Sequence, residues 1–380
     1  MMKKKEEELM YHIGVIGSGH RLTPLVMRLA ENDDFQVRAV CDPADVREKY
    51  EGHDVTFYTD AEEMLKKESL DCLMIGTRCS LHTKFMVLAA QYGLPTFLEK
   101  PVCINEEQLA ELEALTEINE KVVVSFPLRN APIVNEVREI IRSGKIGRVA
   151  HVQAFNNVNY ARGYYHKWYR DEGETGGLWL QKATHDFDYI NSLLDTRPVT
   201  IAAMDAKQVF KGEMPAGQKC VDCAHRRTCP ESDQNVIASN DPFLPPGEYC
   251  CFATDTGNED SGSALVLYEN GIHAVYSQNF ITRRSAGKRG ARLIGYYGTV
   301  EFNFNTGEIT LIYHNKNHVE SHKIEKTHGH SGGDAALIQN FANVVRGLET
   351  SKAPLSDGIL SAKMCLLAKR SAKEKVFLNL

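Results

Sequence analysis

The sequence has no long hydrophobic run, since no apolar stretch approaches the roughly 18 residues that a membrane-spanning helix needs. It also shows no secretion signal, because the opening MMKKKEEELM is charged and no apolar segment follows it. Basic residues are not in excess: 44 basic and 50 acidic residues give a net charge of −6, which argues against nucleic-acid binding and against a polybasic membrane anchor. These absences predict a globular protein of the cytoplasm, whose ten cysteines are reduced thiols.

The first third of the chain alternates short apolar runs with amphipathic segments. The apolar runs lie at 12–17, 35–42, 71–77, 94–99 and 121–126, and the helical candidates lie near 22–32, 61–67, 82–92 and 106–119. This alternation predicts an α/β Rossmann domain over residues 10–131, with a parallel sheet covered by helices on both faces.

The pattern changes from about Val149 onwards. Strand-like runs lie near 149–157, 198–209, 263–268, 272–280, 291–296, 299–303 and 308–313, and helical segments return near 333–348 and 356–373. These runs predict an α+β domain over 132–355 with an open, mostly antiparallel sheet. A segment rich in Pro, Gly and Cys forms an insertion at 211–260, and we expect residues 356–380 to pack back toward the first domain.

The segment IGVIGSGHRL follows a strand and opens a helix. Gly17 and Gly19 occupy the first two positions of a G-x-G-x-x-G turn, which allows a tight turn and a close approach to a pyrophosphate, whereas Leu22 replaces the third glycine. Asp42 ends the next strand, where an acid holds the adenosine ribose and favours NAD over NADP. The alternative is a glycine turn that binds no nucleotide. The turn residues assigned to the cofactor are Gly17, Ser18, Gly19, His20, Arg21 and Leu22.

Five ordered segments resemble motifs of the glucose–fructose oxidoreductase, inositol dehydrogenase and MocA (Gfo/Idh/MocA) family. They are GTRCSLHTKFMVLAAQYGLPTFLEKP, IRSGKIGRV, TGGLWLQKATHDFD, HSGGDAALIQNFANVVRG and APLSDGILSAKMCLLAKRSAK. The resemblance covers most of the chain. It implies a Rossmann domain followed by an α+β domain whose sheet forms a homodimer or homotetramer. It also implies NAD(P)-dependent oxidation or reduction of a secondary alcohol in a sugar, cyclitol or related compound.

The resemblance also implies roles for single residues. Lys100 of the EKP motif lies near the nicotinamide and the substrate, and His185 is the acid–base residue. The helix around His185 departs from the family pattern, because Gln181 and Ala183 stand where Asp and Gly are common and Lys182 lies beside them. The other cofactor contacts that the resemblance implies are Thr77, Arg78, His82, Glu99 and Pro101.

The chemistry of hydride transfer suits these residues. Removing a hydride from a C–H bond leaves the neighbouring hydroxyl with a proton to lose, and a histidine has a pKa suited to accept it. The Lys100 ammonium would stabilise the developing alkoxide, and Lys182 would add to this effect or lower the pKa of His185. Asp188 is the candidate that orients His185. The alternatives are a core histidine at 185 and a structural lysine at 182.

An aromatic segment, NYARGYYHKWYRDEGETGGLW, precedes this helix. Its rings and polar tips suit a sugar, and the alternative is that they anchor a loop or a subunit interface. In KTHGHSGGD, the resemblance places His330 at the border of the substrate pocket; alternatively, Ser331 or Asp334 serves the start of a helix. The substrate candidates are Arg162, His166, Trp168, Gln181, Asp188 and His330.

The insertion carries a group of cysteines. Cys220, Cys223 and Cys229, followed by Cys250 or Cys251, match the pattern of a tetrahedral structural zinc site. An iron–sulfur cluster and unligated thiols are the alternatives.

Three functions remain open at this level. The first is an NAD(P)-dependent dehydrogenase acting on CH–OH groups. The second is an NAD-dependent enzyme that cleaves glycosides by transient oxidation of the sugar, and the third is an NAD-binding protein without turnover.

Overall fold

The computed structural model describes residues 10–240, 247–325 and 329–380. These residues form two compact units: 10–130 and 332–360 make the first, and the described residues between 131 and 331 join 361–380 in the second. The assignment of 332–360 differs from the predicted boundaries, which gave residues 132–355 to the second domain. The reason is local packing, because Phe341 packs edge-on against Phe97, with ring centroids 5.7 Å apart, and Arg346 pairs with Asp34.

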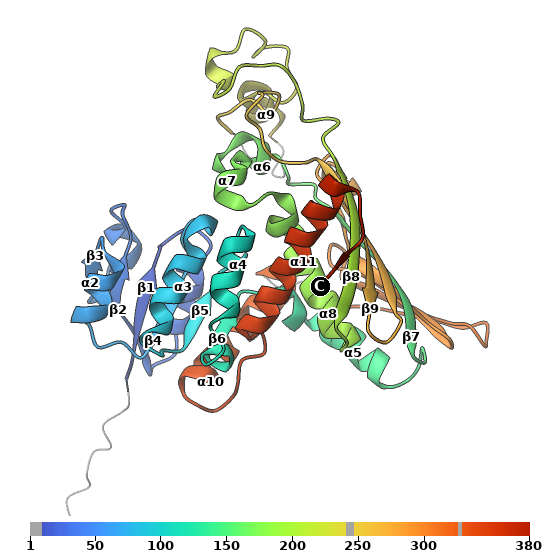
Figure 1. The fold of residues 1–380 in the computed structure, drawn as a ribbon, viewed down its shortest axis with the longest axis horizontal. Coiled ribbons are helices and arrows are strands. Elements are labelled where there is room, and N and C mark those ends of the chain that lie inside the picture. The colour runs from blue at the N-terminus through green and yellow to red at the C-terminus, as the bar shows by residue number, and fades with distance from the viewer. Residues whose placement is uncertain (1–9, 241–246, 326–328) are drawn as a thin grey trace, which may run out of the picture. The chain divides into compact units, whose positions relative to one another are not determined.

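The first unit contains a six-stranded, fully parallel sheet of strand order β3-β2-β1-β4-β5-β6 (Figure 1). This confirms the predicted Rossmann domain. Helices α3 and α4 pack side by side, as do α1 and α10. The strands are β1 (Tyr11–Ile16), β2 (Phe35–Cys41), β3 (Thr56–Tyr58), β4 (Cys72–Ile75), β5 (Thr96–Leu98) and β6 (Val122–Val124), and the helices are α1 (Thr23–Ala30), α2 (Ala61–Lys67), α3 (His82–Ala90), α4 (Glu106–Glu113) and α10 (Gly333–Val345).

The central strands of this sheet carry apolar residues in continuous runs. Every residue of β4, β5 and β6 is buried, as expected for parallel strands that are covered on both faces. Strand β3 was not predicted. It has only three residues, all exposed or partly exposed at the sheet edge, so it carries no continuous apolar signal.

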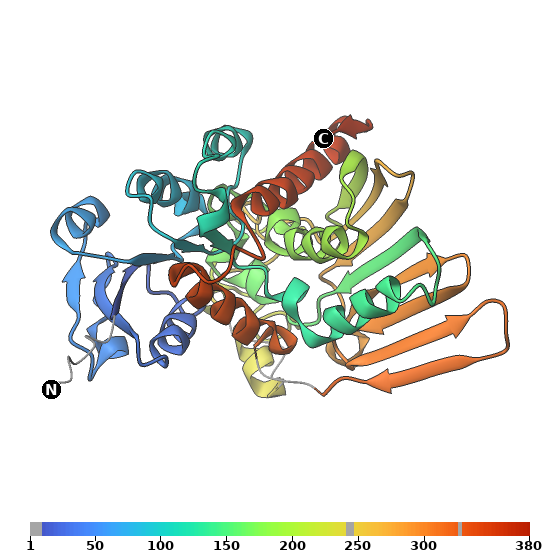
Figure 2. The same ribbon diagram turned by 90° about the horizontal axis from the view of Figure 1, so that it is seen from below.

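The second unit is built on a nine-stranded sheet of order β14-β13-β12-β11-β7-β10-β9-β8-β15 (Figure 2). All neighbours are antiparallel except β7 and β10, which confirms the predicted, mostly antiparallel sheet. The strands are β7 (Val149–Asn157), β8 (Pro198–Ala206), β9 (Ser261–Tyr268), β10 (His273–Asn279), β11 (Lys288–Gly295), β12 (Gly298–Asn303), β13 (Glu308–Tyr313), β14 (Val319–Lys323) and β15 (Leu378–Asn379). Strands β14 and β15 were not predicted, because β14 is polar and exposed and β15 has only two residues.

Helices cover one face of this sheet, as Figure 2 shows, with α5 (Pro132–Arg142) against β12 and α8 (Thr184–Leu194) against β7. Strand β9 shows the resulting alternation: Ala264 and Val266 are buried, whereas Leu265 and Leu267 between them are exposed. Helix α11 (Leu355–Glu374) begins in the first unit and ends in the second.

The insertion between β8 and β9 has little regular structure. Its described part holds the short helix α9 (Asp233–Ser239) and two isolated β-bridges, Met214 with Ala253 and Lys219 with Tyr249. Across the described parts of the chain, helices that combine the length and the apolar character needed to cross a bilayer are absent.

Candidate functional site

The predicted cofactor residues of the first unit gather at one edge of the parallel sheet. Gly17 follows β1, Asp42 follows β2, Thr77 comes two residues after β4, and Glu99 follows β5. Because the strands are parallel, their carboxyl ends meet at the same edge, which is where open α/β sheets bind ligands.

The glycine turn has the backbone that the motif requires. Gly17 has φ +82°, and a Cβ placed on it would lie 2.8 Å from the carbonyl oxygen of Gly76. At Gly19 the nearest atom to such a Cβ is that same oxygen, at 3.7 Å, so the space over the turn is open for a ligand. Leu22, in place of the third glycine, is buried against Gly76, where a side chain would clash with it. The close helix–strand approach is therefore provided by Gly76 instead.

Asp42 is fixed beside the turn. One carboxylate oxygen accepts the Ser18 N–H at 2.7 Å and the other accepts the Ala44 N–H at 2.9 Å. The Ser18 hydroxyl in turn lies 2.9 Å from the Tyr50 hydroxyl, and Lys49 donates to the Ser18 carbonyl at 2.6 Å. A cavity of about 190 Å³ opens beside Asp42, lined by Asp42, Pro43, Ala44, Asp45, Val46, Arg47, Phe57, Tyr58 and Thr59. Its position at the end of β2 suits the adenosine half of a dinucleotide.

Arg21 links the turn to the EKP motif and to α10. Its guanidinium donates two hydrogen bonds to the Asp334 carboxylate, at 2.9 and 2.7 Å, and lies 3.3 Å from Glu99. Burial lowers the pKa of Arg21, but Glu99 and Asp334 outweigh this effect and raise it, so Arg21 stays cationic. Glu99 also accepts the Ser125 hydroxyl at 2.9 Å.

His82 is buried behind the EKP motif. Its Nδ1 lies 2.7 Å from the carbonyl oxygen of Pro101 and its Nε2 lies 3.3 Å from that of Thr77. Burial lowers the pKa of His82. The structure thus places His82 as a brace between two cofactor-edge segments, and the Lys100–Pro101 peptide that it supports is cis.

In the second unit, the predicted catalytic helix begins with a π-helical turn, Trp179–Ala183, and continues as α8. Single π turns are often found at functional sites. Lys182 lies in this turn and is buried between two tyrosines. Its Nζ donates to the Tyr160 hydroxyl at 2.9 Å and lies 4.5 and 4.6 Å from the ring centroids of Tyr160 and Tyr164. Burial lowers the pKa of Lys182, but the two hydroxyls outweigh burial and raise it, so Lys182 remains a cation.

His185 lies three residues after Lys182, with 6% of its surface exposed. Its ring centroid is 6.0 Å from that of His330, so these two predicted site residues are neighbours. His330 and Ser331 both have left-handed backbone, with φ +44° and +57°, which side chains disfavour. His328, beside them in the sequence, lies outside the described residues.

Asp186, the residue after His185, anchors the helix to the sheet. The side chain is fully buried and accepts three hydrogen bonds: from Asn156 of β7 and Tyr276 of β10 at 2.9 Å each, and from Arg289 of β11 at 2.8 Å. The sequence had favoured Asp188 as the orienting acid, and that side chain is also buried. The Asp186 contacts hold the helix turn on which His185 stands.

Glu259, at the end of the insertion, holds the start of the same helix. Its carboxylate accepts the N–H of Trp179 at 2.9 Å and that of Leu178 at 3.4 Å. Burial raises the pKa of Glu259 to about 7. Gln181, one of the predicted substrate residues, is buried and donates to the Thr175 carbonyl at 3.1 Å.

The aromatic segment contacts the insertion. Arg162 is fully buried and donates to the Glu231 carbonyl at 2.7 Å, while His166 Nδ1 lies 2.6 Å from the Tyr249 carbonyl oxygen. Trp168 stacks on Tyr169 with ring centroids 3.8 Å apart. The structure thus shows that Arg162 and His166 pack against the insertion. Their predicted contact with the substrate stays a prediction.

Several residues of the site were not found from the sequence. Asp186, Glu259 and the two tyrosines around Lys182 are polar groups that become partners only when distant segments meet. Only Tyr160 and Tyr164 had a signal, since they belong to the aromatic segment singled out above.

The chain matches a known family over nearly its whole length. Residues 11–126 match the "Oxidoreductase family, NAD-binding Rossmann fold" and 138–380 match the "Oxidoreductase family, C-terminal alpha/beta domain", the two parts of the Gfo/Idh/MocA family.

Relatives and solved structures agree with this match. The YteT protein of Bacillus subtilis, named as an oxidoreductase without a stated substrate, is 28% identical over 333 residues, or 76% of each chain. An inositol 2-dehydrogenase of Rhizobium meliloti is 28% identical over 39% of this chain and 44% of its own. A levoglucosan dehydrogenase solved with NADH and levoglucosan has a TM-score of 0.77 at 14% identity, covering 97% and 99% of the two chains, which shows the shared fold. The chain therefore belongs to the Gfo/Idh/MocA family of NAD-binding oxidoreductases.

Proposed function

We propose that the protein is an NAD-dependent dehydrogenase that acts on a secondary alcohol of a sugar, cyclitol or related polyol. The observation that carries the proposal is the fixed helix turn of His185, which is anchored below by Asp186 and lies beside His330 and the Lys182 cation. An anchored imidazole next to a permanent positive charge suits the removal of a hydroxyl proton.

The residues divide the work of this reaction. His185 accepts the proton of the substrate hydroxyl, and the role that the family resemblance gives to Lys100 is to stabilise the alkoxide with its positive charge. Lys182 adds positive charge to the helix, and His330 and Asp188 contribute contacts to the other hydroxyls. The nicotinamide supplies the hydride acceptor when it is bound. The open space over Gly19 and the cavity beside Asp42 fit such a dinucleotide.

The names of relatives narrow the substrate class that we propose. One similar protein is an inositol 2-dehydrogenase and one similar structure holds levoglucosan, and both compounds are cyclic polyols. A screen of cyclitols, aldoses and anhydrosugars with NAD and with NADP tests the proposal. We expect nicotinamide reduction with at least one polyol and a preference for NAD.

Replacing His185 with alanine separates catalysis from cofactor binding. We expect His185→Ala to lose turnover while NAD binding, followed by the quenching of protein fluorescence, is unchanged. Turnover that survives in this variant removes His185 from the mechanism. Aglycone release from glycosides without net nicotinamide reduction would identify the glycoside-cleaving alternative.

We also propose that the protein forms a homodimer or homotetramer through the open face of its large sheet. Leu265, Leu267 and Val275 lie on this face and are 48%, 43% and 36% exposed, and Met204 on β8 is 79% exposed. A face with several exposed apolar side chains commonly marks an interface. Light scattering should give a dimer or tetramer mass, and Leu265→Arg should lower it.

A further inference from the structure

We propose that the insertion binds one zinc ion through the thiolates of Cys220, Cys223, Cys229 and Cys250, and that this ion is structural. The proposal does not depend on the dehydrogenase function, because it rests on a group of side chains in the insertion alone.

The backbone brings the two ends of the cysteine pattern together. Lys219 and Tyr249 form an antiparallel bridge, Cys220 donates its N–H to the Glu248 carbonyl at 2.9 Å, and Cys250 donates to the Gln218 carbonyl at 2.8 Å. In such a pair, residues next to the bridge lie on the face opposite to it, so Cys220 and Cys250 are diagonal neighbours on one face. A separation of 30 residues in sequence is thus closed by a local ladder.

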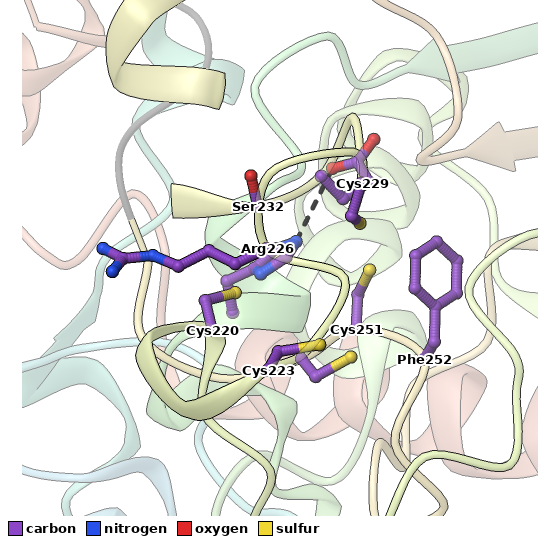
Figure 3. Close-up of a pocket in the computed structure, with 10 residues that line it drawn as sticks. Cys220, Cys223, Arg226, Cys229, Ser232, Cys251 and Phe252 are labelled. Carbon is purple, nitrogen blue, oxygen red and sulfur yellow. Dashed lines mark ion pairs between the residues drawn. The ribbon is translucent and has the colours of Figure 1, made fainter. Parts of the chain in front are cut away.

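Tight turns bring in the other two cysteines. The N–H of Cys223 bonds back to the Cys220 carbonyl at 3.2 Å, and that of Cys229 bonds to the His225 carbonyl at 2.9 Å. All four cysteines line one small cavity of about 20 Å³, together with Cys251, and Figure 3 labels Cys220, Cys223, Cys229 and Cys251 around it. A cavity of roughly 10–15 Å³ on this measure holds a single water, so there is room for one ion but not for an organic ligand.

The surroundings suit a charged thiolate centre. Four thiolates around Zn²⁺ carry a net charge of −2, and Arg226, which also lines the cavity, is paired with Asp233 at 2.6 Å. Soft sulfur ligands in a closed tetrahedral set favour zinc over hard cations.

A second donor set borders the same cavity and has to be distinguished. Donor atoms of His166, Glu231 and Cys251 lie within 4.8 Å of one another, whereas among the described residues no three sulfurs of the proposed set come that close, so zinc binding would draw these four sulfurs together. Two observations indicate that these three residues line the cavity and do not bind the metal. Glu231 already faces the guanidinium of Arg283 at 3.3 Å, and Cys251 is fully buried in an apolar cluster with Tyr165, Leu178 and Phe280. Cys251 lines the same cavity as Cys250, so variants of the two residues have to decide which of them binds the metal.

A bound metal would stabilise the insertion, which has little regular structure. The described part of the insertion, residues 211–240 and 247–260, holds one short α-helix and a 3-10 turn, and a long segment with so little regular structure gains little stability from packing. A closed zinc site contributes its binding energy directly to folding. The same segment holds the aromatic segment in place, since Asn258 donates to the carbonyls of Tyr164 and Tyr169 at 2.8 and 2.9 Å.

Metal analysis of the full-length protein, purified without chelators, tests the proposal. We expect about one zinc per chain in the wild type, and at least a fivefold lower content in Cys223→Ser and Cys229→Ser, whose positions are only partly buried and so tolerate serine. Cys251→Ala is the matched control and should retain zinc. Near-zero zinc in the wild type, iron in its place, or full zinc in both serine variants overturns the proposal.

Two further measurements guard against a misfolded variant. Titration of the wild type with an organomercurial should release zinc as four thiols react. Protein grown with Co²⁺ should show the strong charge-transfer and visible bands of a tetrahedral thiolate site. Loss of zinc in Cys251→Ala together with its retention in Cys250→Ser would show that the trio with His166 is the ligand set, and would overturn the assignment made here.

Discussion

Glu259 offers a pH-dependent test of how the catalytic helix is held. The carboxyl is buried, and burial raises its pKa to about 7 from the ordinary value of 4.5, while hydrogen bonds from its own backbone N–H and from that of Leu178 lower the pKa. Between these two pKa values the folded state binds more protons than the unfolded state, so stability falls as pH rises. The contribution is complete below about pH 4.5 and is lost as pH rises through about 7.

The size of the effect follows from the shift. A shift of about 2.5 units corresponds to about 3 kcal/mol in total, of which about 2 kcal/mol falls between about pH 5.5 and pH 8.5. Glu259→Gln keeps a carbonyl oxygen for the Trp179 N–H and removes the titration. For a unit of this size, about 2 kcal/mol corresponds to about 4–8 °C in Tm. The difference in Tm between Glu259→Gln and the wild type should therefore grow by about 4–8 °C, in favour of the variant, as pH rises over this range.

The comparison has to be made between variant and wild type, because other groups titrate in the same range. Burial lowers the pKa of His82 and His166, so their contributions fall as pH falls, opposite in sign to that of Glu259. Glu213→Gln, an exposed carboxyl on the same insertion, is the charge control and should follow the wild type. A Tm difference between Glu259→Gln and wild type that stays constant with pH would refute the reasoning.

Three other predictions concern the anchor, the lysine and the cofactor. Arg289→Met leaves the buried Asp186 carboxylate without its ion pair and should lower the free energy of unfolding by about 3–5 kcal/mol, measured by urea unfolding. Adding Asp186→Asn should recover part of this loss. If the double variant shows no recovery, the two residues are not coupled. Lys182→Met should lower kcat by about 10²-fold with little change in Tm if the charge acts on the reaction, whereas a fall in Tm alone would show a structural lysine. Asp42→Ala should shift the ratio of NADP to NAD affinity toward NADP by about tenfold, or about 1.4 kcal/mol, in binding titrations, and an unchanged ratio would show that Asp42 does not read the ribose.

The sequence predicts those parts of the molecule whose signal is local. Gly17 and Asp42 are recognisable because a tight turn and an acid at a strand end are encoded within a few residues, and the alternation of apolar runs predicts both sheets. The edge strand at 56–58 was not predicted because it is short and not buried. Residues 332–355 were assigned to the other domain because the sequence of a helix does not indicate which sheet the helix covers, whereas the contact of Phe341 with Phe97 does.

The polar partners of the catalytic helix could not be predicted for a related reason. Asp186 and Asp188 are both charged residues on one helix, and periodicity alone favours the one three residues after His185. The predicted role of Asp188 toward His185 stays a prediction. The anchoring role of Asp186 comes from strands β7, β10 and β11, which present an amide, a hydroxyl and a guanidinium to it from positions 30 to 103 residues away. A buried carboxylate needs such partners, since desolvation without them is costly. The residue that anchors the helix is therefore determined by the sheet beneath it, and only a structure identifies it.

Lys182, which stands beside the residues that depart from the family pattern, has partners that compensate for its buried charge. Lys182 stands in the π turn of the helix, and a cation buried there requires compensation, which Tyr160 and Tyr164 provide through a hydroxyl and two aromatic faces. Tyr164 is tied through its carbonyl to Asn258, next to Glu259, which holds the start of the helix. The insertion thus contacts both the lysine cage and the helix terminus. If the zinc site orders the insertion, metal loss should weaken Lys182 positioning before it affects the Asp186 anchor, which lies on the sheet side of the helix.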